Sequence, residues 1–445
     1  MGTLIMISQF VLSLTILVVL HECGHFFPAR WFKIRVEKFY LFFDPWFSLV
    51  KKKIGDTEYG IGWLPLGGYV KISGMVDESM DLEQLKQEPK PWEFRSKPAW
   101  QRLIIMVGGV FVNFMLGFFI FAMLLWKNGI EYVPIDQMKY GISVDSIGYS
   151  MGFRDGDQLV KVGDKQMDRF DTGLLIKTLL LDEKSKVQVL RNGELVTIDV
   201  PQELRSQLAK PEMKNMKPWG IRTPTVIDSI IVGSGAEKAG LKPGDQIISV
   251  NDSSASFAHE FFKMLKNKVN TEISLKITRE ADTLTILAST NENGTLGVYP
   301  KNPLMFLKTE KEEFNFLQSI PKGVSTGVDL LVTQLKAFKQ MFAGNIAAKD
   351  SLGGFASIAK MFDTTWDWTS FWRMTAILSI ILGFMNLLPI PGLDGGYVVF
   401  LMIEVISGRK VPDKIIEKAT LVGFILLMAL LLYANGLDVF RAFGK

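Results

Sequence analysis

The chain has 445 residues, of which 48% are hydrophobic and 22% are charged, a mixture typical of a membrane protein with a substantial soluble part. The net charge of +4 is too small and too dispersed to indicate a nucleic acid partner. The single cysteine, Cys23, excludes an intrachain disulfide.

The first apolar segment runs from about Leu4 to Phe27 and is long enough to cross a bilayer, which takes around 20 residues. Near its end stands the sequence HECGH. On a helix His21 and His25 share one face, with Glu22 beside them. In this H-E-x-x-H pattern two imidazoles hold zinc and the glutamate activates water. Ordinary core or solvated histidines are the alternative, but ionisable groups inside an apolar segment are costly and usually functional.

The remaining cysteine and histidine give weaker signals. Cys23 occupies a variable position of the motif and faces away from both histidines on a helix, which favours packing over the nucleophile of a Cys-His protease. His259 lies in polar sequence without a partner motif, so we expect it at the surface.

Between the first two apolar segments, residues 58–74 show alternating apolar residues and include Gly67 and Gly68, which predicts a β-hairpin. An exposed edge of this hairpin could pair with an extended peptide by strand addition. An ordinary amphipathic hairpin is an equally good interpretation.

The second predicted span, residues 103–126, is followed by a far more polar region with an internal repeat. MGFRDGDQLVKVGDK from Met151 aligns with AGLKPGDQIISVNDS from Ala239, 88 residues later. Gly-Asp followed by alternating apolar residues indicates a turn into a strand, so we expect two tandem α+β domains, 127–212 and 213–305. The identical positions include Gly152/Gly240, Gly156/Gly244, Asp157/Asp245, Gln158/Gln246, Val162/Val250 and Asp164/Asp252.

These two domains resemble PDZ domains, the second more closely through GSGAEKAGLKPGDQIISVND. PDZ domains usually bind a peptide by strand addition and hold a terminal carboxylate in backbone N–H groups. A steric gate that limits what reaches the membrane is an equally good interpretation. Residues 306–373 then contain amphipathic helical segments, such as 328–342, and a tryptophan group that fits an interfacial belt, Trp366, Trp368 and Trp372.

The third predicted span begins near Met374 and is broken around Pro389 and Pro391 in the sequence NLLPIPGLDGGYVVF. Unwound backbone at membrane depth persists only where protein buries it or water reaches it. Asp394 follows the break at a depth that matches the two histidines, so it is the candidate third ligand of an otherwise incomplete zinc site. A simple kink is the alternative.

The fourth predicted span, about residues 420–434, is short, and Glu404 before it is expected to reach water at the membrane surface. Lysines and arginines mark the loops that remain in the cytoplasm. They follow the first span, precede the second and lie between the third and fourth. The N-terminus, residues 127–373 and the C-terminus are therefore expected outside the cytoplasm. The residues concerned include Arg30, Lys33, Arg35, Lys38, Lys51, Lys97, Arg102, Arg409, Lys410, Lys414 and Lys418.

Together, HECGH and NLLPIPGLDGG resemble the two motifs of the site-2 protease family of intramembrane zinc metalloproteases. Nearly the whole sequence is similar to the bacterial members with two PDZ domains that cleave anti-sigma factors. The resemblance implies a polytopic α-helical membrane protein with four transmembrane helices, two tandem PDZ-like α+β domains and a membrane-associated β-hairpin. It implies a bacterial inner membrane location, with residues 1–126 and 374–445 forming the protease core and 306–373 lying outside the cytoplasm.

The same resemblance implies roles for individual residues. His21, His25 and Asp394 would bind Zn2+ and Glu22 would be the catalytic base. The residues that would hold the substrate strand are Asn386, Pro389, Pro391, Gly67 and Gly68. Two departures concern loop details: Phe42-Phe43-Asp44 stands where many members have Gly-Phe-Gly, and Gly109-Val110-Phe111-Val112-Asn113 where many have Gly-Pro-x-x-Asn.

We therefore expect an intramembrane zinc metalloendopeptidase acting in regulated intramembrane proteolysis. Its expected substrates are single-pass membrane proteins, such as a pre-trimmed anti-sigma factor, or remnant signal peptides. The alternative is a catalytically inactive membrane PDZ scaffold or receptor with a vestigial metal site, which has no reason to bury four ionisable groups. A metal transporter is a third option, but the second and fourth spans lack the polar or acidic residues it would need.

Overall fold

The computed structural model describes the chain except for residues 66, 76–87, 183–185, 211–216 and 444–445. The described residues form two compact units. The helical unit comprises Met1–Gly129, Glu313–Phe338 and Leu352–Lys445, and the β unit comprises Ile130–Glu312 and Lys339–Ser351. The domain boundary predicted at residues 212 and 213 lies outside the described residues.

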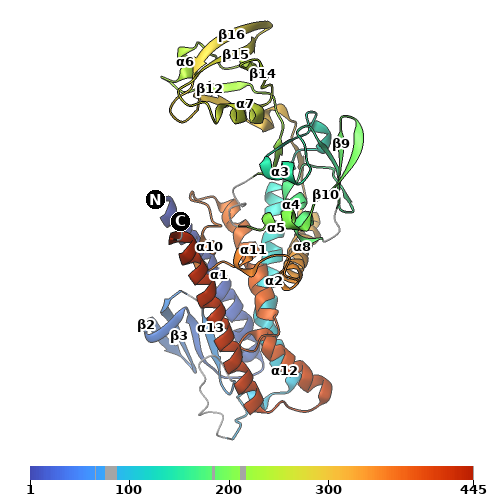
Figure 1. Cartoon of the computed structure of the whole chain (residues 1–445). Coiled ribbons are helices and arrows are strands. Elements are labelled where there is room, and N and C mark those ends of the chain that lie inside the picture. Colours follow the sequence, from blue (N-terminus) through green and yellow to red (C-terminus); the bar gives the residue numbers. More distant parts are fainter. Residues whose placement is uncertain (66, 76–87, 183–185, 211–216, 444–445) are drawn as a thin grey trace. The chain divides into compact units, whose positions relative to one another are not determined.

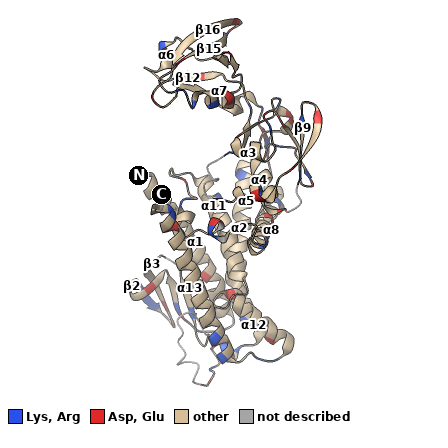
Figure 2. Cartoon of the chain, in the orientation of Figure 1, with Lys and Arg blue, Asp and Glu red and all other residues tan. Residues whose placement is uncertain are grey.

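The helical unit contains four helices long and apolar enough to cross a membrane, which confirms the four predicted spans. They lie side by side in Figure 1, and their middle parts carry few charges in Figure 2. Each helix extends beyond its predicted apolar segment, because backbone hydrogen bonds continue into polar flanking sequence. The helices are α1 (Gly2–Trp31), α2 (Ala99–Asn128), α11 (Trp368–Leu387) and α13 (Asp413–Phe443).

Helices α1 and α2 approach each other closely where both contain glycine. A Cβ built on Gly24 would overlap the carbonyl oxygen of Gly108, and a Cβ on Gly108 would overlap that of Gly24. Small residues allow this backbone contact between membrane helices. The contact brings the motif-bearing face of α1 directly against α2.

The break predicted in the third span is confirmed. Helix α11 ends at Leu387, and α12 (Asp394–Ser407) begins after a non-helical turn that contains both prolines. Gly392 in this turn has φ +98°, which favours glycine. Helix α13 lies against the turn so closely that a Cβ on Gly423 would overlap the carbonyl group of Pro391.

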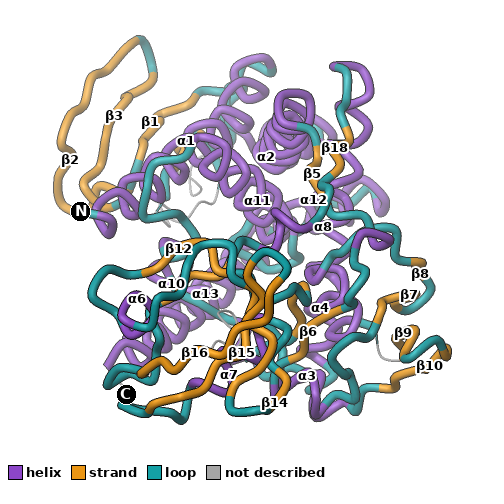
Figure 3. The backbone as a smooth tube through the Cα atoms, turned by 90° about the horizontal axis from the view of Figure 1, so that it is seen from above, coloured by secondary structure: helices purple, strands orange, loops and turns teal. Residues whose placement is uncertain are grey.

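A four-stranded sheet packs beside α1 (Figure 3), and its topology corrects the predicted hairpin. The two predicted hairpin strands, β3 (Thr57–Leu64) and β4 (Tyr69–Ile72), do not pair with each other. The strand β1 (Val36–Leu41) lies between them, parallel to β3 and antiparallel to β4, and β2 (Phe43–Ile54) covers the far side of β3. The alternation of apolar residues identified the two strands but not their partners. The pairing depends on β1, which buries Val36 and Tyr40 at the centre of the sheet.

The rest of the helical unit packs around these elements. Helix α8 (Phe316–Phe342), which contains the predicted amphipathic segment, lies on α2 and α11 through Gly323 and Gly327. Glu404, expected to reach water, instead forms an ion pair with the buried Arg102 of α2. The shorter helices of the unit are η2 (Phe94–Ser96) and α10 (Phe355–Ala359).

The β unit contains two halves of similar construction, each with a four-stranded antiparallel sheet and its own apolar core. The strands expected after each Gly-Asp are confirmed at equivalent positions, because β7 and β13 begin 88 residues apart. The first half has β7 (Gln158–Val162), β8 (Lys165–Gln166), β9 (Lys186–Arg191), β10 (Glu194–Asp199) and α4 (Thr172–Leu181), and the second has β13 (Gln246–Val250), β14 (Ser253–Ser254), β15 (Glu272–Arg279), β16 (Asp282–Ser289) and α7 (Ala258–Leu265).

Short elements complete the β unit. They connect the sheets or pair in two-stranded ladders, namely β11 with β6, β12 with β17 and β18 with β5. Their bounds are β5 (Ile130–Tyr132), η3 (Ile135–Gln137), β6 (Ile142–Val144), α3 (Ser146–Ser150), α5 (Gln202–Gln207), β11 (Trp219–Ile221), β12 (Ile227–Ile230), α6 (Gly235–Lys238), β17 (Val298–Pro300), η5 (Pro303–Phe306), β18 (Glu310–Glu312) and α9 (Ala348–Ser351).

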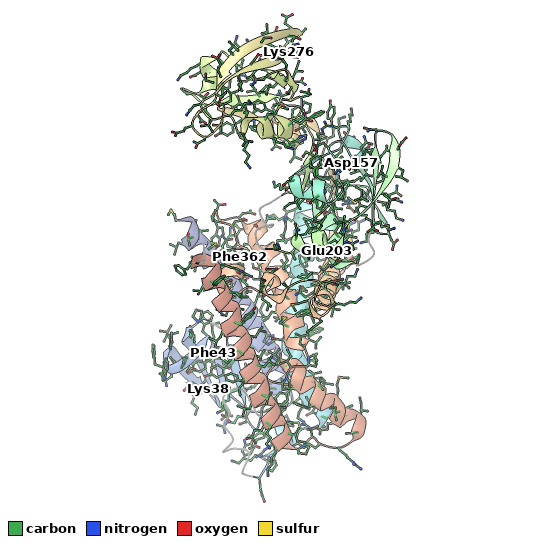
Figure 4. All side chains as sticks on the ribbon, viewed as in Figure 1. Lys38, Phe43, Asp157, Glu203, Lys276 and Phe362 are labelled. Carbon is green, nitrogen blue, oxygen red and sulfur yellow. The ribbon has the colours of Figure 1, made fainter. Side chains whose placement is uncertain are left out.

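The same ion pair recurs in both halves. Asp157, labelled in Figure 4, receives two hydrogen bonds from Arg191 at 2.7 and 2.8 Å, and Asp245 receives two from Arg279 at 2.7 Å each. These bidentate bonds satisfy carboxylates that the cores bury. His259, expected at the surface, is half-buried on α7, with its Nε2 atom 3.0 Å from Asp155.

We expect Arg191→Gln to destabilise the first half of the β unit by about 1–3 kcal/mol, because Asp157 would remain buried without its bidentate donor. Hydrogen exchange of β7 and β9 should become faster in the full-length protein. The matched control Glu194→Gln alters an exposed residue of the same sheet and should leave exchange unchanged. Unchanged exchange in Arg191→Gln would show that the ion pair contributes nothing.

Candidate metal centre and active site

Three buried or half-buried side chains converge inside the layer of apolar helices. His21 and His25 come from α1, and Asp394 is the first residue of α12. The two Nε2 atoms are 3.3 Å apart, and each lies 3.3 Å from Oδ2 of Asp394. The structure therefore brings together the three predicted ligands as a nearly equilateral triangle of donor atoms.

Hydrogen bonds from α2 orient both imidazole rings. Nδ1 of His25 lies 2.8 Å from the carbonyl oxygen of Ile105, so this nitrogen donates its hydrogen and Nε2 keeps its lone pair. The amide of Asn113 lies 3.1 Å from Nδ1 of His21, and its Oδ1 is buried without another partner among the described residues. A half-turn of this amide lets Oδ1 accept a hydrogen from Nδ1, which gives His21 the same tautomer.

The backbone of α2 makes room for these rings. A Cβ on Gly109 would overlap Nε2 of His25 and lie 2.7 Å from Cε1 of His21. Only glycine therefore fits beside the donor triangle. The sequence places the amide of Asn113 inside an apolar helix, where it could serve helix packing or the site, and the structure puts it against His21. The role of Gly109 beside the histidines was not predicted from the sequence.

The donor set fits zinc. Two neutral imidazole lone pairs and one carboxylate oxygen face a common point, and Asp394 Oδ2 has no hydrogen-bond donor among the described residues. Zinc bonds of about 2.0–2.1 Å to such ligands in tetrahedral geometry place neighbouring donors roughly 3.3–3.4 Å apart. The measured separations of 3.3 Å agree with that spacing. Three protein ligands also match catalytic rather than structural zinc sites.

Glu22 lies next to the triangle, and its carboxylate faces the backbone N–H of Val70 in the edge strand β4. Gly68 brings this strand close, since its Cβ position lies 3.6 Å from Cγ of Glu22 and 2.7 Å from Val18. The sheet and the motif helix thus meet at the predicted catalytic base.

The other predicted site residues lie at different distances from the triangle. The amide nitrogen of Asn386 is 3.3 Å from Nε2 of His21, at the edge of the metal centre. Pro389 and Pro391 lie in the turn between α11 and α12. Gly67 has φ +150° and its Cβ position lies 2.9 Å from the Phe43 ring. It therefore lies in the segment that leads into β4, beside Phe43.

Comparison with known proteins agrees with this geometry. The sequence pattern of peptidase family M50 matches residues 9–430. The chain is 28% identical to the regulator of sigma-E protease RseP of Escherichia coli, over 99% of this chain and 98% of that protein. It is 26% identical to the regulator of sigma E protease of Haemophilus influenzae, over 98% of each chain. It is 28% identical to a protein of Borreliella burgdorferi named "Putative zinc metalloprotease", over 96% of each chain.

We expect Gly109→Ala to reduce zinc affinity by about 10–100-fold or more, because the added methyl group must displace His25. Zinc per purified chain, measured by elemental analysis after dialysis against a graded chelator, tests this. Gly436→Ala is the matched control, since it adds the same group to a helix position with open space around it. Equal zinc retention by both variants would contradict the expectation.

Removal of the Asn113 amide should weaken zinc binding more mildly. We expect Asn113→Ala to lower the affinity by about tenfold, at the lower end of the effect of losing a ligand's hydrogen-bond partner. Asn113→Gln or Asn113→Asp, which keep an acceptor, should recover part of the loss. The role assigned to this amide would be wrong if the alanine variant bound zinc as tightly as the unaltered protein.

Proposed function

This chain belongs to peptidase family M50, the site-2 protease family, and from that premise we propose which of its residues cut the peptide bond and which substrates they meet. The chain is a zinc metalloendopeptidase that acts in regulated intramembrane proteolysis. The observation that supports the residue roles most strongly is the triangle of donor atoms with Glu22 beside it.

In this proposal His21, His25 and Asp394 hold zinc, and Glu22 is the general base. Zinc in such a site lowers the pKa of water to about 7 and polarises a carbonyl group. Glu22 accepts a proton from the attacking water and delivers it to the leaving amine. The N–H of Val70 orients the carboxylate, and the tautomers set by Ile105 and Asn113 keep both Nε2 atoms available.

The substrates we propose are single-pass membrane proteins, such as a pre-trimmed anti-sigma factor, and remnant signal peptides. A transmembrane helix hides its carbonyl groups in hydrogen bonds, so the segment to be cut must first unwind. The outer edge of β4 and the turn of Pro389 and Pro391 support this part, because both lie beside the metal centre. Asn386, Gly67 and Gly68 would then contact the extended segment.

The membrane location we propose is the bacterial inner membrane, with the metal centre towards the cytoplasm. Lysines gather at the end of the helical unit where α13 begins (Figure 2), including Lys414 and Lys418, and the positive-inside rule places that end in the cytoplasm. The β unit and both termini would then lie outside the cytoplasm. Its two halves would be PDZ domains that bind a peptide or C-terminus, or that exclude bulky substrates.

An inactive scaffold with a vestigial metal site is not favoured. Such a protein has no reason to keep the ligands in one tautomeric arrangement, or to leave glycine at the one α2 position that a Cβ would block. Both features are needed only if the donor atoms bind a cation.

We expect Glu22→Gln to reduce cleavage by at least about 10²-fold, because the amide cannot accept the proton, while zinc content stays unchanged. Asp394→Ala should lose both zinc and cleavage. The assay uses a tagged single-pass substrate with its outer domain removed, expressed in a host without its own such protease and followed by immunoblot. Cleavage that survives Glu22→Gln would remove Glu22 as the base, and zinc retained fully by Asp394→Ala would remove Asp394 as a ligand.

A further inference from the structure

A set of hydrogen bonds on the sheet of the helical unit lies one strand away from the metal centre. The hydroxyl group of Tyr69 donates to Oδ1 of Asp44 at 2.9 Å, and that of Ser48 donates to Oδ2 of the same carboxylate at 3.0 Å. Asp44 is thus bound from two sides. It joins β2, which contains Asp44 and Ser48, to β4, which contains Tyr69, although these strands are not neighbours in the sheet.

Aromatic stacking supports this connection. The ring of Tyr69 lies 5.3 Å from that of Tyr40 at an angle of 13°, and 6.1 Å from that of Phe43 at 10°. Phe43 is labelled in Figure 4 on the sheet beside the helices. Tyr40 is buried in the central strand and donates to Glu58 of β3 at 2.7 Å. The stack therefore holds the side chain of Tyr69 in place while Asp44 determines where its hydroxyl group points.

The backbone around Tyr69 faces the catalytic base. Val70, the next residue, presents its backbone N–H to the carboxylate of Glu22. Gly68, the residue before β4, has its Cβ position 3.6 Å from Cγ of Glu22. Strand β4 has only four residues and lies at the edge of the sheet, paired with β1 on one side. A short edge strand has few hydrogen bonds of its own to fix its position.

We propose that Asp44 and Tyr69 are positioning residues for Glu22. Their hydrogen bond fixes β4, and β4 holds the Glu22 carboxylate through the N–H of Val70. The inference rests on the proposed function, in which Glu22 is the general base. Neither residue is required to touch the substrate. Asp44 stands at a position where the chain departs from the Gly-Phe-Gly of many related proteases, so this positioning is a property of this chain.

The protonation state of Tyr69 suits the role. Burial, and then the hydrogen bond to Asp44, raise the pKa of Tyr69 well above its ordinary value of 10.0. The hydroxyl group therefore remains a neutral donor throughout the pH range in which a protease of this kind is assayed.

Tyr69→Phe tests the proposal, because it keeps the aromatic stack and removes only the hydroxyl group. With the full-length protein in detergent and the tagged single-pass substrate, we expect kcat to fall about tenfold, less than the roughly 10²-fold cost of a catalytic group misplaced by 1 Å. KM and zinc content should not change. Hydrogen exchange of the peptide that contains Val70 should become faster. Asp44→Ala should behave in the same way, and Asp44→Asn, which keeps an acceptor, should recover most of the rate.

Tyr59→Phe is the matched control, since it removes a hydroxyl group from β3, which lies beyond β1 in the same sheet, on the face that packs on Phe26. It should have the kcat of the unaltered protein. An unchanged kcat in Tyr69→Phe, a rise in KM alone, or loss of zinc would each overturn the proposal. Glu22→Gln in the same assay distinguishes failure of the proposed function from failure of this inference. If Glu22→Gln still cleaves the substrate, Glu22 is not the general base, whatever the result for Tyr69→Phe.

Discussion

The helical unit depends on one electrostatic constraint: two imidazole lone pairs and a carboxylate oxygen point at a common centre inside an apolar layer. Lone pairs of two imidazoles and a carboxylate oxygen crowded within 3.3 Å of one another are unfavourable unless a cation or a proton lies between them. In the proposed site, bound zinc would reverse this balance, because the three costly groups would become its ligands. Residues far apart in the chain serve this constraint, from the ring-orienting carbonyl of Ile105 to the glycine that leaves space at position 109.

The interrupted third span serves the same constraint. In a continuous helix, the preceding turns would set the direction of the Asp394 side chain. The turn at Pro389 and Pro391 instead starts a new helix at Asp394, so its direction is set independently of α11. The turn leaves backbone groups without helical partners, and α13 covers it at Gly423. The fourth span thus contributes no ligand, yet it buries the backbone that the third ligand requires.

The sequence indicated which side chains the structure brings together where chemistry restricts the residue type and spacing. His21, Glu22 and His25 stand at helical spacing, and a proline-broken apolar segment indicated Asp394. The sequence left the role of the Asn113 amide open between helix packing and the site, and it did not identify the carbonyl group of Ile105. Both come from another helix, 92 and 80 positions away from the histidines they contact. The hairpin prediction failed for a related reason: alternation shows which residues form strands, but pairing depends on the central strand β1, whose burial only the assembled sheet reveals. The Arg partners of Asp157 and Asp245 were likewise not recognised, since each lies 34 residues after its aspartate and outside the matching segment.

The proposed ligands and the proposed base are held in different ways. His21 and His25 stand on a long helix pressed against α2, so their geometry is rigid. Glu22 instead depends on Val70 in a short edge strand, and an edge strand is where an extended peptide adds to a sheet. In the proposed mechanism, a substrate segment that pairs with β4 would share this edge with Glu22, the proposed base. Substrate binding and proton transfer would then be coupled through β4. The orientation of Glu22 would depend on how firmly β1 and the Tyr69–Asp44 hydrogen bond hold β4 in place.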